Sequence, residues 1–137
     1  MEDIKRFFKN DRFAAYNGIE ILEFSKGHAR AKMEITDNHK NGLGIVHGGA
    51  VFTLADLAFA VASNSHGTVA VSINANISNM TAASSGTLYA DAREISINPK
   101  LGTYTVDVTN EKGEIIAIFQ GMVYRKKDRI DQLDIKG

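Results

Sequence analysis

The sequence contains no cysteine and no tryptophan, and it has only one proline among its 137 residues. Without cysteine the chain has no disulfide bonds, no thiolate metal site and no cysteine nucleophile. Sixteen basic and sixteen acidic residues give a formal net charge of zero. A neutral chain lacks the positive charge that proteins use to bind nucleic acid nonspecifically. We therefore expect no nucleic-acid partner.

Long apolar runs are also missing. None approaches the roughly 20 residues that a helix needs to cross a bilayer, and the first residues contain no apolar signal core. We expect no membrane partner and, by default, a cytoplasmic location. A chain of 137 residues has the length of one domain and can hold a real core. A single domain over residues 1–137 is expected, with its core at about 17–125.

Most of the chain alternates between apolar and polar side chains, which is the period of a β-strand. The predicted strands cover residues 19–24, 28–35, 68–77, 88–97, 103–109 and 115–124. Short turns rich in glycine and asparagine join several of them, so the sheet should be mainly antiparallel. In the strand over 68–77, the alternation places Val69, Val71 and Ile73 on one face.

The two ends of the chain have weaker patterns. Ile4, Phe7 and Phe8 recur at helical spacing, which predicts a short helix over residues 3–8. Phe13 and Tyr16 should extend an aromatic cluster that seals one end of the domain. The charged tail over residues 126–137 is expected to be loosely ordered.

The most distinctive segment is an apolar helix that follows His47 and runs to Ala62. Two glycines begin it, and after them its only polar side chains are Thr53 and Asp56. A helix without a polar face must be wrapped on most sides by apolar groups. A twisted antiparallel sheet can curl around it. The predicted fold is therefore α+β, with about five or six mainly antiparallel strands around one long apolar central helix.

This helix and its flanks carry a family resemblance. The sequence Asn-Gly-Leu-Gly over 41–44 precedes His47-Gly48-Gly49, and Asp56 lies in a Leu-Ala-Asp triplet nine residues after the histidine. The combination resembles the hotdog-fold acyl-CoA thioesterases of the phenylacetic-acid-degradation (PaaI-like) family. The resemblance covers residues 17–125. It implies a hotdog fold and an acyl-CoA substrate, with coenzyme A as part of the substrate and no separate cofactor.

Thioester hydrolysis develops negative charge on the carbonyl oxygen, and the first turn of a helix supplies unpaired N–H groups that can stabilise it. The resemblance implies that the Gly48 N–H is this donor. It also implies that His47 shapes the loop and that Asn41 positions the carbonyl group or the water. Asp56 is then either the nucleophile or the general base.

Gly48 and Asp56 are separated by about 12 Å along a straight helix, too far for both to contact one carbonyl group. The two groups must therefore come from different chains, so a dimer is the minimum assembly. The family resemblance implies the same arrangement at a dimer interface. It also implies pairing of dimers, so we expect a homotetramer.

Further contacts with the substrate are expected around this pair. Ser72 matches a position where the family often carries a hydroxyl group, and Gly49, Phe52 and Phe59 are candidates for the wall of the substrate site. The phosphates of coenzyme A make Arg125 and Lys126 candidates at the end of the last strand. The family often carries a proline and basic residues in the loop at 80–86. Here that loop is uncharged, which leaves Ser84 and Ser85 for this contact.

Structural roles compete with these assignments. Asp56 could bind a neighbouring backbone segment, the two glycines could serve only close packing, and the basic residues at 125–129 could be a solvated strand end. Three histidines show no metal-ligand spacing, so no metal is expected: His28, His39 and His66. The alternative function is a noncatalytic acyl-CoA-binding or sensing module. A hydratase fits less well because it uses a different arrangement of histidine and acid.

Overall fold

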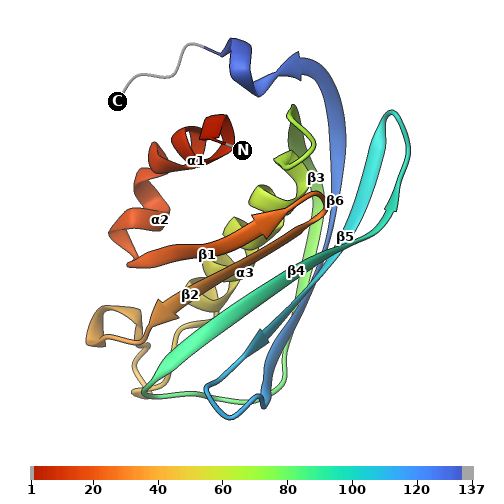
Figure 1. Cartoon of the computed structure of the whole chain (residues 1–137). Coiled ribbons are helices and arrows are strands. Elements are labelled where there is room, and N and C mark those ends of the chain that lie inside the picture. Colours follow the sequence, from red (N-terminus) through yellow and green to blue (C-terminus); the bar gives the residue numbers. More distant parts are fainter. Residues whose placement is uncertain (1, 134–137) are drawn as a thin grey trace.

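The computed structural model describes residues 2–133 and shows a six-stranded sheet curled around one long helix, α3 (Gly48–Asn64) (Figure 1). The strands are β1 (Ile19–Ser25), β2 (His28–Glu34), β3 (Thr68–Asn79), β4 (Thr87–Ile97), β5 (Leu101–Thr109) and β6 (Ile115–Arg129). Their order is β1-β2-β4-β5-β6-β3, and every neighbouring pair is antiparallel. The shorter helices are α1 (Glu2–Lys9), α2 (Arg12–Tyr16), η1 (Asp37–His39) and η2 (Ile130–Gln132). The predicted α+β architecture is confirmed.

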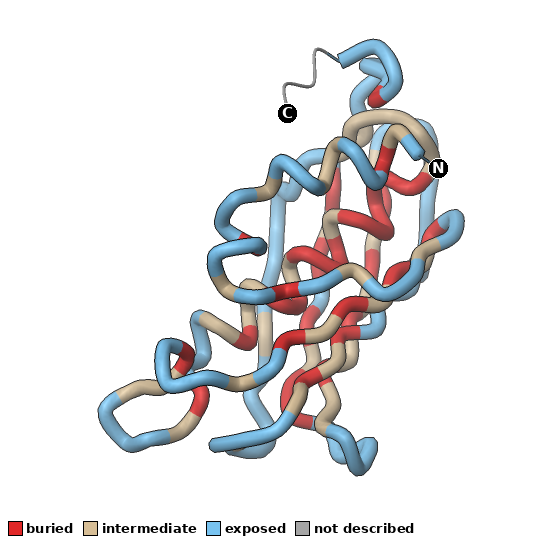
Figure 2. The backbone as a smooth tube through the Cα atoms, turned by 60° about the vertical axis from the view of Figure 1, so that its left-hand side comes forward, coloured by how far each residue is buried: buried red, intermediate tan, exposed pale blue. Residues whose placement is uncertain are grey.

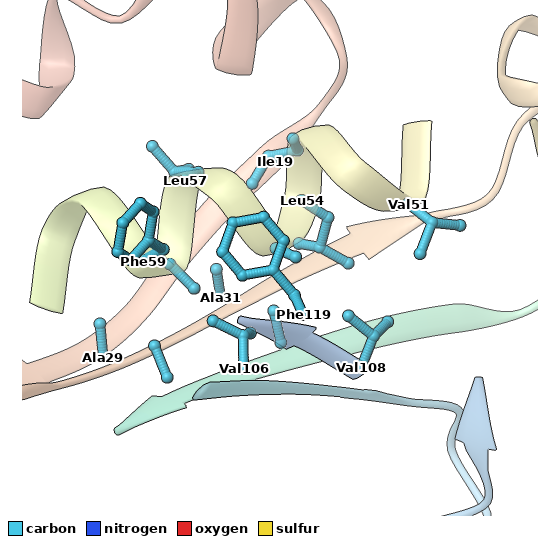
Figure 3. Packing of buried hydrophobic residues seen from close by; sticks show 14 of the residues in the cluster. Ile19, Ala29, Ala31, Val51, Leu54, Leu57, Phe59, Val106, Val108 and Phe119 are labelled. Carbon is cyan, nitrogen blue, oxygen red and sulfur yellow. The ribbon is translucent and has the colours of Figure 1, made fainter. Parts of the chain in front are cut away.

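Small inward-facing residues let the sheet approach the helix closely. Along β2 and β4, Ala29, Ala31, Ala90 and Ala92 are each no more than 1% exposed. Larger side chains fill the space further along the helix, including Leu54 of α3 and others shown in Figure 3. The buried positions in Figure 2 follow the inner surface of the curled sheet and the helix inside it. One core therefore holds the whole domain together.

Phe59 lies at the centre of this core. Its ring centroid is 5.3 Å from that of Phe119 and 5.8 Å from that of Tyr104, and the residue is 1% exposed. The ring packs directly on Gly121 of β6, where a methyl group would come within 2.6 Å of it. In the single chain Phe59, predicted to line the substrate site, is therefore a core side chain.

Strand β3 departs from the predicted alternation. Within residues 2–133 it is an edge strand with β6 as its only neighbour, and its register shifts between Ser72 and Asn74. Cross-strand partners point to the same face of a sheet. Ser72 is paired with the buried Val123 and so faces the helix, whereas Val71 is paired with the exposed Tyr124. The bulge therefore moves Val71 to the outer face and brings Ser72 to the inner one.

The ends of the chain also differ from expectation. Phe13 is 65% exposed and Tyr16 is 88% exposed, so the predicted aromatic seal is wrong; Ala14, buried at 5%, is the residue of α2 that packs. At the other end β6 continues to Arg129, and Ile130 is 1% exposed with its N–H donating to Gly67 O at 2.9 Å. The prediction of a loose tail is wrong up to Gln132, and residues 134–137 lie outside the described part. Within residues 2–133, no helix is long and apolar enough to cross a membrane.

The contact between Phe59 and Gly121 gives a stability prediction. Gly121→Ala should destabilise the fold by about 1–3 kcal/mol, because the added methyl group meets a ring that its neighbours hold in place. Urea unfolding followed by circular dichroism measures the change. Gly42→Ala is the matched control, since a side chain there meets no atom within 4 Å. Equal stability of the two variants would show that Phe59 moves aside without cost.

Candidate active site

The start of α3 is organised by His47. Its backbone is extended, with φ −62° and ψ 136°, and it is the N-cap of the helix. The ring folds back so that Nδ1 accepts a hydrogen bond from the Gly49 N–H at 2.8 Å. A methyl group on Gly49 would lie 2.9 Å from this nitrogen, so a glycine is needed there. His47 therefore shapes the loop, and its ring occupies the N–H of Gly49, a residue predicted to line the substrate site.

The Gly48 N–H is different. No acceptor within residues 2–133 is hydrogen-bonded to it, although its neighbours in the first turn donate to His47. Gly48 is also exposed. The first turn of α3 therefore presents one free donor with the positive end of the helix dipole behind it, which is the environment that stabilises a developing oxyanion.

The loop before the helix is held by Asn41. Its Oδ1 accepts from the Leu43 N–H at 2.9 Å and from the Ile45 N–H at 3.4 Å, and its backbone pairs with Ile45. The buried His39 also anchors the loop. Its Nε2 is 2.8 Å from Asn17 O, and its backbone O accepts from the His47 N–H at 2.7 Å. The Asn41 amide oxygen is therefore occupied within the loop, and only its NH₂ group can reach a ligand.

A cavity of about 260 Å³ lies between this loop, the start of α3 and the end of β3. It brings together Asn41 and Gly48, as the sequence predicted, and adds Asn79, the last residue of β3. Sequence reasoning missed Asn79. Its only signal was a polar residue at the end of the strand after the helix.

Asp56 lies on a single uncovered stripe of α3. From Val51 to Asn64 the only residues that are not buried are Phe52, Thr53, Asp56 and Ala60. Burial, and secondly the charge of Asp11, raises the pKa of the Asp56 carboxyl above its usual value. No side chain or backbone N–H in the described part donates a hydrogen bond to it. An unsatisfied, partly buried carboxylate of this kind is suited to act as a base or nucleophile.

The two predicted catalytic groups are not brought together within one chain. α3 is an uninterrupted helix of 17 residues, so Gly48 and Asp56 are separated by about 12 Å along its axis. Two of the predicted substrate contacts lie on different elements. Ser72 is on the inner face of β3, and the half-buried Phe52 is on α3. Phe52 packs edge-on against Phe119, with ring centroids 5.3 Å apart.

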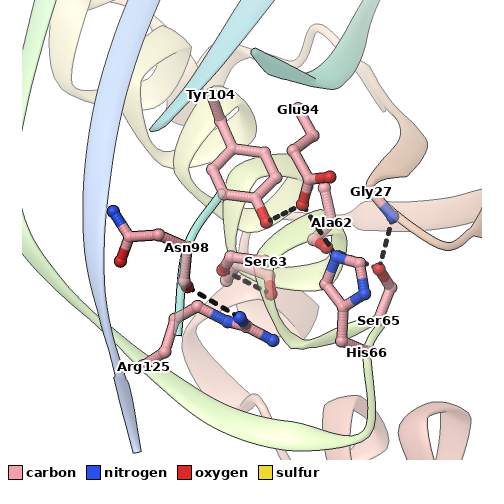
Figure 4. Close-up of polar contacts among 10 residues, drawn as sticks. Gly27, Ala62, Ser63, Ser65, His66, Glu94, Asn98, Tyr104 and Arg125 are labelled. Carbon is pink, nitrogen blue, oxygen red and sulfur yellow. Dashed lines mark hydrogen bonds and ion pairs between the residues drawn. The ribbon is translucent and has the colours of Figure 1, made fainter. Parts of the chain in front are cut away.

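A second polar cluster lies at the other end of α3 (Figure 4). Glu94 Oε1 accepts from Tyr104 OH at 2.7 Å and is 2.7 Å from His66 Nε2. Burial raises the pKa of Glu94, but hydrogen bonds from Tyr104 and His66, with the charges of His66 and Arg125, outweigh it and lower the pKa overall. Burial and the bond to Glu94 raise the pKa of Tyr104, which therefore stays a donor. The cluster fixes the end of α3 to the sheet.

The predicted contacts to coenzyme A lie apart from one another. Arg125 Nη1 donates to Asn98 O at 2.8 Å in the turn after β4, whereas Lys126 is exposed. Ser84 and Ser85 are exposed in the loop that borders the cavity at the start of α3. Within residues 2–133 no three His, Asp or Glu side chains are arranged to hold a metal ion.

Comparison with known proteins identifies relatives. A family profile described as "Thioesterase superfamily" matches residues 43–117. A putative esterase of Archaeoglobus fulgidus is 41% identical over 91% of this chain and 82% of its own. Acyl-coenzyme A thioesterase PaaI of Escherichia coli is 34% identical over 86% of this chain and 85% of its own.

Solved structures of similar proteins also superpose on this chain. The structure of the E. coli PaaI protein superposes with a TM-score of 0.90 at 31% identity, over 93% of this chain and 94% of that one. The protein smu.793 of Streptococcus mutans, solved bound to acetyl CoA, has a TM-score of 0.77 at 28% identity, over 81% and 90% of the two chains.

The raised pKa of Asp56 predicts a pH-dependent cost to stability. A raised pKa in the folded state means that ionisation of Asp56 weakens the fold as the pH rises through that pKa; below the usual value of 3.8 the penalty is absent. Asp56→Asn should therefore raise the thermal midpoint at pH 7 by a few degrees, with a smaller gain at more acidic pH. Calorimetry at several pH values measures this. A midpoint that falls at pH 7 would show that the carboxylate is stabilising.

Proposed function

The chain belongs to the thioesterase superfamily, among its PaaI-like hotdog thioesterases, and on this premise we propose that it hydrolyses acyl-CoA thioesters at sites built from two copies of the chain. One observation carries the proposal: α3 combines a free N–H at its start with an unsatisfied carboxylate on its only uncovered stripe. The proposed substrates carry an aryl-acetyl or a short- to medium-chain acyl group.

In the proposed reaction, the thioester carbonyl oxygen accepts a hydrogen bond from the Gly48 N–H. Charge develops on this oxygen as the carbonyl carbon becomes tetrahedral, so a donor fixed at a helix start lowers the barrier. Loss of one such donor typically costs about 10²- to 10³-fold in rate. Asn41, whose oxygen holds the loop, is left with its NH₂ group to orient the substrate or the water.

Asp56 supplies the attack by one of two routes. As nucleophile, the carboxylate adds to the carbonyl carbon, the C–S bond breaks, and coenzyme A leaves as a thiolate. Water then opens the resulting anhydride, and a proton released in that step converts the thiolate to the thiol. As general base, Asp56 takes a proton from the water that attacks the carbon, and that proton passes to the leaving sulfur. Both routes require ionised Asp56, and its raised pKa makes it a better base near neutral pH.

Two features of the single chain support a site shared between copies. The stripe around Asp56 on α3 is not covered by the chain's own sheet or by α1 and α2. Strand β3 has a free edge, and Ile73 on it is 54% exposed. Pairing of two β3 edges would satisfy their backbone groups, as edge strands require. It would also set the stripe of one α3 against the other copy, so that Asp56 of one chain meets Gly48 of the next.

The first test is release of free thiol from a panel of acyl-CoAs that spans aryl-acetyl and straight-chain groups. We expect turnover with at least one, and we expect Asp56→Asn to reduce kcat by about 10²- to 10⁴-fold, since it removes the attacking carboxylate but keeps the side-chain shape. Calorimetric binding of the same acyl-CoAs is the parallel measurement. Tight binding without turnover by the native chain would favour the sensing module instead.

The second test mixes two inactive variants. Gly48→Pro removes the proposed donor, and proline is tolerated at the first position of a helix, where the extended His47 before it is also compatible. Asp56→Asn removes the attacking group. Refolding equal amounts together should restore about a quarter of native activity, because half of the dimers contain both chains and each of these has one intact site.

Gly48→Ala is the matched control, because it keeps the N–H and its methyl group would make only ordinary contact, 3.6 Å from the nearest neighbouring atom. It should retain more activity than Gly48→Pro, which lacks the N–H. Mixed dimers that form, as shown by native mass spectrometry, yet stay inactive would rule out a site shared between chains.

A further inference from the structure

The cavity at the start of α3 contains a polar side chain for which the proposed reaction has so far no role. Asn79 lines this cavity together with Gly48 and Asn41. It is the last residue of β3, and it pairs across the sheet with Ala117, which is fully buried. Cross-strand partners share a face, so the Asn79 side chain is on the helix side of the sheet.

The backbone holds this position firmly. Directly after Asn79, the N–H groups of Met80 and Thr81 both donate to Ile116 O, at 2.8 and 3.2 Å. The end of β3 is therefore anchored to β6 at the point where it passes the start of α3. The side chain projects from a fixed strand end and not from a free loop.

The Asn79 amide lies beside the proposed oxyanion donor. A methyl group on Gly48 would have Asn79 Nδ2 as its one neighbour within 4 Å, at 3.6 Å. Within residues 2–133 the Asn79 amide makes no hydrogen bond, whereas the oxygen of Asn41 and the N–H of Gly49 are both engaged inside the loop. The cavity thus contains one free backbone N–H with a fully free carboxamide next to it, and the NH₂ group of Asn41.

We propose that Asn79 is a second donor to the thioester carbonyl oxygen, acting beside the Gly48 N–H of the same chain. This inference rests on the proposed thioesterase function. Two donors at one oxygen are the usual composition of an oxyanion site, and the first turn of α3 supplies only one because His47 occupies the other. In this proposal the Asn79 side chain supplies the second donor in place of the Gly49 N–H, which is bonded to His47.

Kinetics of Asn79→Ala test this role. Loss of the donor should lower kcat by at least tenfold, toward the roughly 10²-fold effect of removing one oxyanion donor, while KM rises by no more than about tenfold. Asn76→Ala is the matched control, because Asn76 is on the same strand but pairs with the exposed Gln120 on the outer face. It should keep native activity. If Asn79→Ala stays within a few-fold of the native kcat, the donor role is wrong although hydrolysis itself stands.

Binding of two unreactive analogues separates the donor role from a structural one. A ketone analogue, with methylene in place of sulfur, keeps the carbonyl oxygen; a thioether analogue keeps the sulfur and lacks that oxygen. Asn79→Ala should weaken the ketone analogue by roughly 2- to 10-fold, the effect of one hydrogen bond, and leave the thioether analogue unchanged. Equal weakening of both would overturn the proposal, because the contact would then be to another part of the ligand.

These outcomes are distinct from failure of the proposed function. A native chain that releases no thiol from any acyl-CoA contradicts the hydrolase, whatever Asn79 does. The analogue measurements need no turnover, so they still decide whether Asn79 recognises the carbonyl oxygen. Equal thermal midpoints of the native chain and Asn79→Ala confirm that the variant is folded.

Discussion

The structure depends on one requirement: the apolar helix α3 must be removed from water. Ten of its 17 residues are buried, and full burial of one large apolar side chain contributes about 1.5–3 kcal/mol. Alanines on the inner faces of β2 and β4 let the sheet curl close to the helix, and Gly121 makes room for the ring of Phe59. The sheet, with α1 and α2, covers α3 on every side except one stripe. That stripe contains Asp56.

The two ends of α3 differ in how fully their polar groups are hydrogen-bonded. At its C-terminal end, Ser65 donates to Ala62 O at 2.6 Å and accepts from the Gly27 N–H at 2.7 Å, while Glu94, Tyr104 and His66 form a closed polar cluster. At its N-terminal end His47 accepts from the N–H groups of Gly49, Ala50 and Val51 and leaves that of Gly48 free. The polar groups that stabilise the fold are thus bonded to one another, and the unsatisfied ones, Gly48 N–H and Asp56, are those that the proposed reaction uses.

The regular parts of this fold could be predicted from the sequence because burial imposes a period. β2 has one buried face and was predicted to within one residue, and α3 only runs two residues further than expected, to Asn64. β3 is exposed on both faces along most of its length, so neither face of it carried a burial signal that could reveal the bulge at Ser72. Asn79 and the Gly49 cap depend on side-chain directions at a strand end and a helix start, which no local pattern encodes.

A free edge strand and an uncovered carboxylate are both unfavourable in a single chain. The free edge of β3 invites pairing with other chains, and ionisation of the half-buried Asp56 costs stability. In the proposed assembly, association of two copies covers both features. Pairing of the β3 edges joins the two sheets, and it sets the stripe of one copy against the loop of Asn41, Gly48 and Asn79 from the other. Association and catalytic competence then become one equilibrium, and a separated chain keeps its fold but contains only the two unmatched halves of a site.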